Sequence, residues 1–348
     1  MNKLLRVLIV DDSAYVRKVV KQMLSRSPFI EVVGAAHDGE EALEMVQELQ
    51  PDVVTLDLIM PRMDGVEFLR RQMAINPVPV IVLSIASESG EMALAALDAG
   101  AVDFVQKPTA LATEKIFDIS EELIEKVKSA ADVPLKRLLA PQLSNSKQAT
   151  SVATKPQSGT LDIIVIGIST GGPQALTFLI PQLPAEMTVP IAMVLHMPVG
   201  YTEMYARRLN QLSNLEVIEA YEGAIVKPGV ALLAAAGRHL SFRRASDGKV
   251  VAHLDARPID TLHRPAVDVL FQSAAEVYRD RVLGIVMTGM GSDGKQGAAW
   301  IKSHGGKIIT EAEETCVVYG MPRSVVEAGL SDRSVPLTLM AQAILEEI

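Results

Sequence analysis

The chain has 348 residues, of which 49% are hydrophobic, and a formal net charge of −9. This length exceeds one typical domain and predicts two, each with enough apolar side chains for a core. Residues 1–125 carry 21 acidic and 11 basic residues, a net of −10, and the remainder has a net charge of +1. Because a nucleic-acid partner requires a basic face, this charge distribution argues against one.

The compartment is indicated by what the sequence lacks. The single cysteine, Cys316, excludes an intrachain disulfide and gives no sign of an oxidising environment. The first residues lead directly into a strand-like run that is too short for a signal peptide, and no apolar stretch reaches the length of a membrane span. We expect a cytoplasmic protein with no direct membrane insertion.

Strand-like and helix-like segments alternate in the first domain, residues 1–125. Apolar runs predict strands at 7–10, 30–36, 53–56, 80–83 and 103–106, and helical patterns lie at 14–24, 40–49, 66–74 and 92–99. Five strands with intervening helices predict a flavodoxin-like α/β domain with a doubly wound parallel sheet. In such a sheet the functional site lies at the carboxyl ends of the strands.

Polar residues follow four of these strands and are, in strand order, Asp11 and Asp12, Asp57, Ser84 and Lys107. Three carboxylates at one edge repel each other and need a cation, and oxygen ligands suit Mg²⁺. A carboxylate beside a cation and a lysine can accept a phosphoryl group, because both positive charges neutralise the phosphate. Taken singly, each aspartate is better explained as a helix cap or a solvated loop end. The five positions together favour a phosphorylation site.

Residues 1–125 resemble the receiver domain of response regulators. The matching residues are Asp11-Asp12, Asp57, Met60-Pro61-x-Met63-Asp64-Gly65, Ser84 and Lys107-Pro108. The resemblance implies that Asp57 is the phosphoacceptor and, with Asp11 and Asp12, binds Mg²⁺. It also implies that Ser84 is the switch hydroxyl and that Lys107 contacts the phosphate.

Two further positions bear on this receiver. Phe104 lies where the family has its switching aromatic residue, although a core phenylalanine explains it equally well. Ile59 stands two residues after Asp57, where similar receivers often have glutamate. A metal would use the backbone carbonyl of this residue, so the departure bears on the lifetime of the phosphate rather than on metal binding.

A linker is predicted at 126–159, although the helical pattern that closes the first domain runs over 113–130. The composition then shifts to Ser, Gln, Ala, Lys and Pro without sustained apolar periodicity. Such a tether lets one domain cover the other and move away. The second domain is expected at 160–348.

The second domain opens on an apolar, β-branched run at 163–166, typical of a buried parallel strand. It leads into Gly167-Ile168-Ser169-Thr170-Gly171, which fits the G-x-S-x-G turn that exposes a serine hydroxyl above a sheet edge. Pro173 then opens a helix, whose first N–H groups can bind an oxyanion. The alternative is a glycine-rich turn whose serine only caps the helix.

Two later strands end in a histidine and an aspartate. The run at 190–195 leads to His196, and the run at 282–287 breaks into a glycine-rich loop that contains Asp293. Ser169, His196 and Asp293 are the three parts of a triad, in which the serine attacks an acyl carbon, the histidine takes its proton and the aspartate holds the imidazole tautomer. Alone, the histidine is more often structural, and the loop is explained as an ordinary turn.

The chain order Ser, His, Asp differs from the Ser, Asp, His order of α/β-hydrolases, which disfavours that fold but not this chemistry. The other histidines lack this setting and are not assigned to the site; they are His37, His239, His253, His263 and His304. No spacing typical of zinc ligands occurs, so no cofactor is expected at the serine site.

From about Leu161 onward the chain resembles the catalytic domain of the chemotaxis protein-glutamate methylesterases, the CheB family. The matching motifs are Gly-x-Ser169-Thr-Gly-Gly, His196-Met-Pro, Arg264-Pro-Ala-Val-Asp268-Val-Leu-Phe, Thr-Gly-Met290-Gly-x-Asp293-Gly and Thr315-Cys316-Val-Val-Tyr-Gly-Met-Pro322. A receiver joined by a linker to this domain is the arrangement of that family. The resemblance implies a mostly parallel α/β methylesterase domain.

The resemblance also implies an activity and its partners. The expected reactions are hydrolysis of glutamate γ-methyl esters on methyl-accepting chemoreceptors, with release of methanol, and deamidation of receptor glutamines. Ser169, His196 and Asp293 are then the catalytic triad, and the backbone N–H groups of Thr170 and Met290 are by position the expected oxyanion donors. The histidine kinase of the chemotaxis system is the expected phosphodonor. The unphosphorylated receiver is expected to restrain the esterase site.

Two departures from the family pattern leave the triad intact. Leu195 stands where the family usually has glutamine, and Ala236 stands where it has proline. They bear on which receptor or regulatory partner is served. Arg207, Arg208 and Arg264 are candidates for steering acidic receptor tails, although a solvated surface charge explains each of them better when taken singly.

Two other functions compete with this interpretation. One is a catalytically idle adaptor whose second domain only binds receptors, against which the complete triad argues. The other is a receiver-regulated transcription factor, which is disfavoured because the near-neutral second half shows no basic recognition helix.

Overall fold

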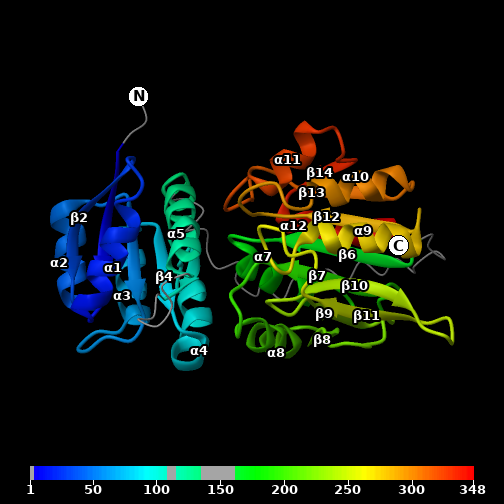
Figure 1. Ribbon diagram of the computed structural model, residues 1–348, viewed down its shortest axis with the longest axis horizontal. Coiled ribbons are helices and arrows are strands. Elements are labelled where there is room, and N and C mark those ends of the chain that lie inside the picture. The colour runs from blue at the N-terminus through cyan, green and yellow to red at the C-terminus, as the bar shows by residue number, and fades with distance from the viewer. Residues whose placement is uncertain (1–3, 108–114, 135–160) are drawn as a thin grey trace. The chain divides into compact units, whose positions relative to one another are not determined.

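The computed structural model describes residues 4–107, 115–134 and 161–348, and these form two compact units that divide between residues 134 and 161 (Figure 1). Most of the predicted linker at 126–159 lies outside the described residues. Helix α5 (Lys115–Ala131) runs past residue 125 and buries Val127 and Ala130. The predicted domain boundary therefore falls inside a helix, because the apolar stripe of α5 continues for more than another turn.

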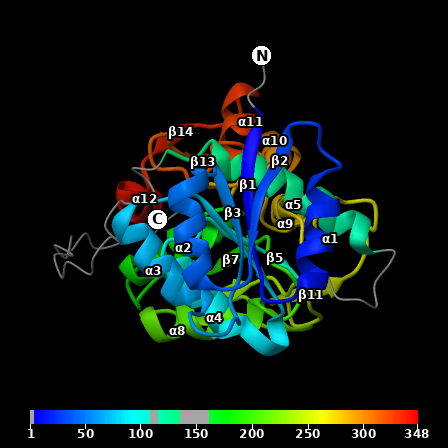
Figure 2. The same cartoon turned by 90° about the vertical axis from the view of Figure 1, so that its left-hand side faces the viewer.

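The first unit is the predicted flavodoxin-like domain, with five parallel strands in the order β2-β1-β3-β4-β5. The strands are β1 (Leu5–Val10), β2 (Ile30–Ala36), β3 (Val53–Asp57), β4 (Val80–Ser84) and β5 (Asp103–Gln106). Before α5 come the helices α1 (Ala14–Leu24), α2 (Gly39–Leu49), α3 (Gly65–Ile75) and α4 (Ala86–Asp98). Figure 2 shows α1 and α5 on one side of the sheet and α2 and α3 on the other.

Side-chain caps fix where three of these helices begin. The Asp38 carboxylate accepts the Glu40 and Glu41 N–H groups in the first turn of α2, at 2.8 and 2.9 Å, and the Asp64 carboxylate accepts Glu67 N–H in α3 at 2.8 Å. Ser13 plays the same part in α1. Helix α4 begins at Ala86, six residues before the predicted start, because the small residues of its first turns give no amphipathic pattern.

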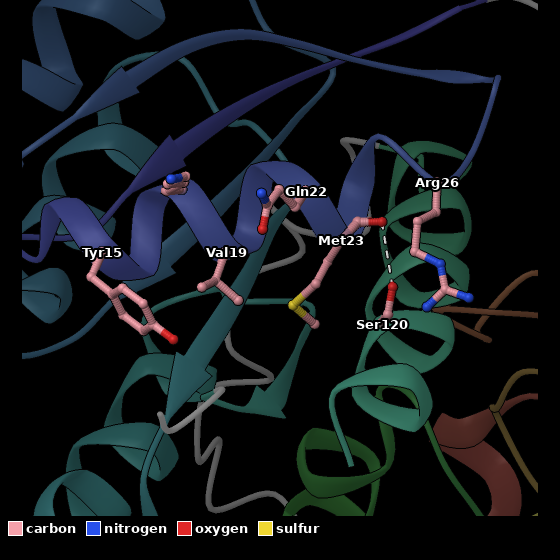
Figure 3. A pocket seen from close by; sticks show the side chains of 7 residues that line it. Tyr15, Val19, Gln22, Met23, Arg26 and Ser120 are labelled. Carbon is pink, nitrogen blue, oxygen red and sulfur yellow. Dashed lines mark hydrogen bonds between the residues drawn. The ribbon is translucent and has the colours of Figure 1, made fainter. Parts of the chain in front are cut away.

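A surface pocket of ≈ 330 Å³ lies along α1 (Figure 3). The Ser120 hydroxyl of α5 donates to the backbone carbonyl of Met23 at 3.4 Å beside it, which ties the two helices together. The pocket is lined by Tyr15, Lys18, Val19, Gln22, Met23, Arg26 and Ser120. None of the predicted phosphorylation-site residues lines it.

The second unit has a seven-stranded sheet in the order β14-β13-β12-β6-β7-β9-β8, in which every recorded strand pair is parallel. Its strands are β6 (Ile163–Ile168), β7 (Ile191–Leu195), β8 (Glu216–Glu219), β9 (Val230–Leu233), β12 (Val282–Val286), β13 (Lys307–Glu311) and β14 (Arg333–Val335). An antiparallel hairpin is formed by β10 (His239–Arg244) and β11 (Val250–Asp255). The mostly parallel α/β prediction is confirmed.

Helices cover this sheet and build its core. They are α7 (Gly172–Leu179), α8 (Thr202–Leu212), α9 (Val267–Tyr278), α10 (Lys295–Ser303), α11 (Met321–Glu327) and α12 (Leu337–Glu347), with a 3₁₀ turn at Ile180–Gln182. In Figure 1, α9 and the β10–β11 hairpin lie in front of the sheet, and their apolar side chains share one core cluster with β6 and β7. Among the described helices, none is long and apolar enough to cross a membrane.

Candidate active site and phosphorylation site

Three loops meet at one edge of the large sheet. Ser169 directly follows β6, His196 directly follows β7, and Asp293 lies in the loop after β12. Strands β12, β6 and β7 are neighbours and run parallel, so their carboxyl ends open at the same edge. The fold places the three residues that the sequence predicted as a triad at this edge, with the side chains of His196 and Asp293 in contact.

The serine turn is held between two loops. Ser169 N–H donates to the Thr288 carbonyl at 3.0 Å, and the Ser169 carbonyl accepts Gly172 N–H, at the start of α7, at 2.7 Å. Gly171 adopts φ 78°, which a side chain would disfavour. A Cβ on Gly289 would lie 2.8 Å from Ser169 Cβ, so only glycine lets the β12 loop come this close. Ser169 is 8% exposed, so most of the residue is covered by its surroundings.

His196 is bonded through one ring nitrogen only. Its Nε2 lies 2.8 Å from Asp293 Oδ2, and among the described residues its buried Nδ1 has no hydrogen-bond partner. Because an ionised carboxylate can only accept, Nε2 carries the proton and Nδ1 carries the lone pair. The nitrogen that can take a proton from a serine is therefore Nδ1, the reverse of the assignment in chymotrypsin-like triads.

Asp293 is held ionised by His196 and by the start of helix α9. Its Oδ2 accepts Val267 N–H at 2.7 Å in addition to His196, and its Oδ1 accepts Asp268 N–H at 2.9 Å and Gly294 N–H at 3.0 Å. Burial alone would raise the pKa of Asp293, but the hydrogen bond and charge interaction with His196, followed by the N–H groups of Val267 and Asp268, outweigh burial and lower it to about 2. The two helical N–H groups add the favourable end of the helix dipole.

Asp268 makes the reciprocal contact with the next helix. Its Oδ1 accepts Gly294 N–H at 2.9 Å and Gly297 N–H at 2.7 Å, at the start of α10. The start of α9 is thus capped by Asp293, from the loop before α10. The start of α10 is capped in turn by Asp268, from the first turn of α9. Burial, together with the charge of Asp293, raises the pKa of Asp268 to about 6.

The raised pKa of Asp268 predicts how the stability of the protein depends on pH. An aspartate titrates near 3.9 when unfolded, so between that pH and about 6 the native state binds the extra proton and stability falls as pH rises. We expect Asp268→Asn, which keeps the accepting oxygen and stays neutral, to stabilise the protein by about 1–3 kcal/mol at pH 7.5 and by almost nothing at pH 4. Thermal unfolding of both proteins at both pH values tests this. Equal or lower stability of the variant at pH 7.5 contradicts it.

Two site residues were missed by the sequence analysis. The His263 ring stacks on the His196 ring, with centroids 4.0 Å apart and planes 22° apart, although His263 had been set aside. Glu311 is fully buried at the end of β13 and accepts Thr288 N–H at 2.9 Å, which anchors the loop beside Ser169. The rule of polar residues at strand ends could have found Glu311, but no local pattern points to His263.

Other predicted residues of this unit lie in or next to the three loops, apart from Arg207, which lies on α8. Thr170 is buried directly after Ser169, and Met290 is half-buried between two glycines. Leu195 is fully buried, and Arg264 donates to the Ile259 carbonyl at 3.2 Å within its own loop. Arg207 is exposed and paired with Glu203 on α8, as a surface charge would be.

In the first unit, the three predicted carboxylates lie together at the ends of β1 and β3. One carboxylate oxygen from each of Asp11, Asp12 and Asp57 lies within 4.8 Å of the others. Lys107 Nζ lies 2.9 Å from Asp11 Oδ2 and 2.7 Å from Asp57 Oδ2. Burial raises the pKa of Asp11 and of Asp57. Burial alone would lower the pKa of Lys107, but its ion pairs with the two carboxylates raise it.

The other predicted receiver residues lie on β4, on β5 and after β3. Ser84 and Phe104 are buried at 0% and 1% exposure, and the Lys126 ammonium lies 6.0 Å from the centre of the Phe104 ring. The Ile59 side chain is 47% exposed. Pro108 lies outside the described residues.

The two units define a class, a response regulator whose second domain is a parallel α/β enzyme domain. Residues 7–117 match the response regulator receiver domain and residues 164–344 match the CheB methylesterase model, so the chain belongs to the CheB methylesterase family.

Similar proteins agree over the full length. The chain is 50% identical over 335 residues to protein-glutamate methylesterase/protein-glutamine glutaminase 5 of Myxococcus xanthus, covering 96% of this chain and 95% of that protein. It is 42% identical over 347 residues to the Thermotoga maritima protein-glutamate methylesterase/protein-glutamine glutaminase, covering 99% of each. The crystal structure of the T. maritima CheB methylesterase catalytic domain matches with a TM-score of 0.53 at 43% identity, covering 54% of this chain and 99% of that domain.

Proposed function

We propose that the chain is a cytoplasmic protein-glutamate methylesterase and protein-glutamine glutaminase that acts on methyl-accepting chemoreceptors in chemotaxis. The observation that carries the proposal is the pairing of His196 with an ionised Asp293 at the edge where β6 presents Ser169. Family membership supplies the substrate class, because the similar proteins carry both activities in their names.

The proposed reaction uses these side chains as a triad. Ser169 Oγ attacks the ester carbonyl carbon of a methylated glutamate while His196 Nδ1 takes the serine proton, and Asp293 stabilises the imidazolium that forms. The backbone N–H groups of Thr170 and Met290 are the proposed donors to the oxyanion. His196 then gives the proton to the departing methanol, and water hydrolyses the acyl-enzyme to free glutamate. With a glutamine substrate, ammonia leaves instead.

Phosphorylation of Asp57 by a histidine kinase is the proposed control. One lysine ammonium cannot neutralise two buried carboxylates, so the three oxygen donors from Asp11, Asp12 and Asp57 fit Mg²⁺, which when bound would offset the charge of the incoming phosphoryl group. Lys107 would contact the phosphate, and Ser84 and Phe104 would respond to it. In this proposal the unphosphorylated receiver restrains the esterase site, and phosphorylation releases it.

Methanol release from methylated chemoreceptor membranes tests the activity and its control together. We expect acetyl phosphate with Mg²⁺ to raise the rate by about 5- to 100-fold, the usual range for coupling between two sites. Asp57→Asn should abolish this rise, because an amide cannot accept the phosphoryl group. Glu48→Gln, at an exposed position of α2, is the matched control and should keep it.

Each outcome has a separate meaning. Serine-dependent release that ignores acetyl phosphate would leave the esterase in place and remove the proposed control. No release from several receptor preparations would favour the adaptor alternative or a substrate outside chemotaxis.

A further inference from the structure

The hydrogen bond between His196 and Asp293 does not by itself fully fix the plane of the imidazole ring. Rotation about the Cβ–Cγ bond of a histidine moves both ring nitrogens, and it moves Nδ1 farther than Nε2 because Nδ1 lies farther from the rotation axis. This torsion is broad and only weakly restrained by its own energetics. A single hydrogen bond to Nε2 therefore restrains this rotation only in part, and Nδ1, the proton-accepting nitrogen, is the ring nitrogen that moves farther when the ring turns.

The His263 ring supplies the missing constraint. It lies almost parallel to the His196 ring, with 4.0 Å between the centroids and 22° between the planes. A flat group against one face of the imidazole blocks rotation toward that side, because the rotating ring would enter its van der Waals volume. The His196 side chain is 8% exposed, so its ring is largely shielded from water, and His263 is half-buried.

The segment that carries His263 is itself firmly held. His239, 1% exposed at the start of β10, accepts Ala266 N–H with Nδ1 at 3.1 Å and donates from Nε2 to the Pro258 carbonyl at 3.0 Å. Both ring nitrogens of His239 are thus used at the two ends of residues 258–266. Burial lowers the pKa of His239, which keeps the neutral form that both bonds require. The Arg264 carbonyl also accepts Gly237 N–H at 2.9 Å.

We propose that His263 is a positioning residue, which holds the catalytic imidazole of His196 in the plane that directs Nδ1 toward the serine hydroxyl. This inference rests on the proposed function. The segment continues into Val267 and Asp268, whose N–H groups hold Asp293, so one stretch of chain fixes both the plane of the histidine and its carboxylate partner. His263 acts through the shape of its ring and exchanges no proton with the substrate.

The test compares two substitutions in the full-length, phosphodonor-activated protein. His263→Ala removes the stacking ring and should lower kcat about 10- to 100-fold, the usual cost of misplacing a reacting group, with KM changed less than about twofold. His263→Phe restores a flat ring without nitrogens and should keep kcat within about threefold of the wild type. The labelling rate of Ser169 by a fluorophosphonate should follow kcat, since it reports activation of the nucleophile without the receptor.

Controls separate this inference from folding and from the proposed function. His304→Ala removes another histidine stacked on an aromatic ring, Trp300, and should leave kcat and KM unchanged. An unchanged kcat in His263→Ala overturns the inference, as does a rise in KM alone. Equal losses in the alanine and phenylalanine variants also overturn it, since a ring nitrogen would then be needed. If Ser169→Ala stays active, the triad itself is wrong and the inference fails with it.

Discussion

Replacing Ser169 by alanine is expected to lower kcat for methyl ester hydrolysis by about four to six orders of magnitude, as loss of a triad nucleophile does elsewhere. The hydroxyl is the only protein group that forms a bond to the substrate carbon in the proposed reaction. The fold changes little, because the backbone groups of Ser169 make the contacts that hold the turn. Methanol release from methylated chemoreceptor membranes at saturating phosphodonor measures the effect.

A serine remote from the three loops provides the control. Ser246 lies exposed in the turn between β10 and β11, and Ser246→Ala should keep the wild-type rate. We expect thermal unfolding of the two variants to show that both are folded. A rate for Ser169→Ala within tenfold of the wild type would exclude a serine nucleophile, and the hydrolysis would then need another group at this edge.

The first unit could be predicted almost completely, because its strands are short runs made mostly of apolar residues. Strands β3 and β4 are buried at every position, which is the condition that produces such runs. Capping aspartates and a serine also mark where three helices begin. The start of α4 was not visible, since a turn of small residues has no apolar side to orient it.

In the second unit, fewer strands of the sheet could be predicted from the sequence. The three strands that were predicted, β6, β7 and β12, occupy the middle of the sheet and are buried throughout. Strands β8, β13 and β14 lie toward the edges and carry exposed charged residues, which interrupt the apolar signal. The β10–β11 hairpin packs one side on α9 and exposes residues such as Arg243, so its pattern alternates weakly.

The candidate site likewise contains residues that could be predicted from the sequence and residues that could not. Ser169, His196 and Asp293 could be placed from the sequence because each follows a central strand, and parallel strands bring such positions together. Their partners could not. The N–H groups that hold Asp293 come from the start of a helix whose direction is a tertiary property. The stacking of His263 depends on a loop without periodicity, tied by His239 from a different strand.

The carboxylate of Asp293 is the position where a nearly isosteric change should have the second-largest effect. Both of its oxygens face only donors, His196 and Val267 at Oδ2 and the N–H groups of Asp268 and Gly294 at Oδ1. An asparagine has one accepting oxygen and one NH₂ group. Whichever way the amide turns, its NH₂ group meets two donors.

Each orientation of the amide has a cost that can be measured. If the NH₂ group faces the imidazole, His196 must shift its proton to Nδ1 and can no longer take one from Ser169, which lowers kcat about 10⁴-fold. If it faces the helix, two N–H groups lose their acceptor, and stability falls by about 1–3 kcal/mol for each unsatisfied group.

We expect Asp293→Asn to show the loss of kcat, a lower unfolding temperature, or both. Asp162→Asn, at a surface ion pair with Arg281, is the matched control and should show neither. Methanol release and thermal unfolding of both variants are the measurements. Full activity and unchanged stability in Asp293→Asn would show that these contacts do not hold a carboxylate in the working enzyme. His196 would then need another group to fix its tautomer.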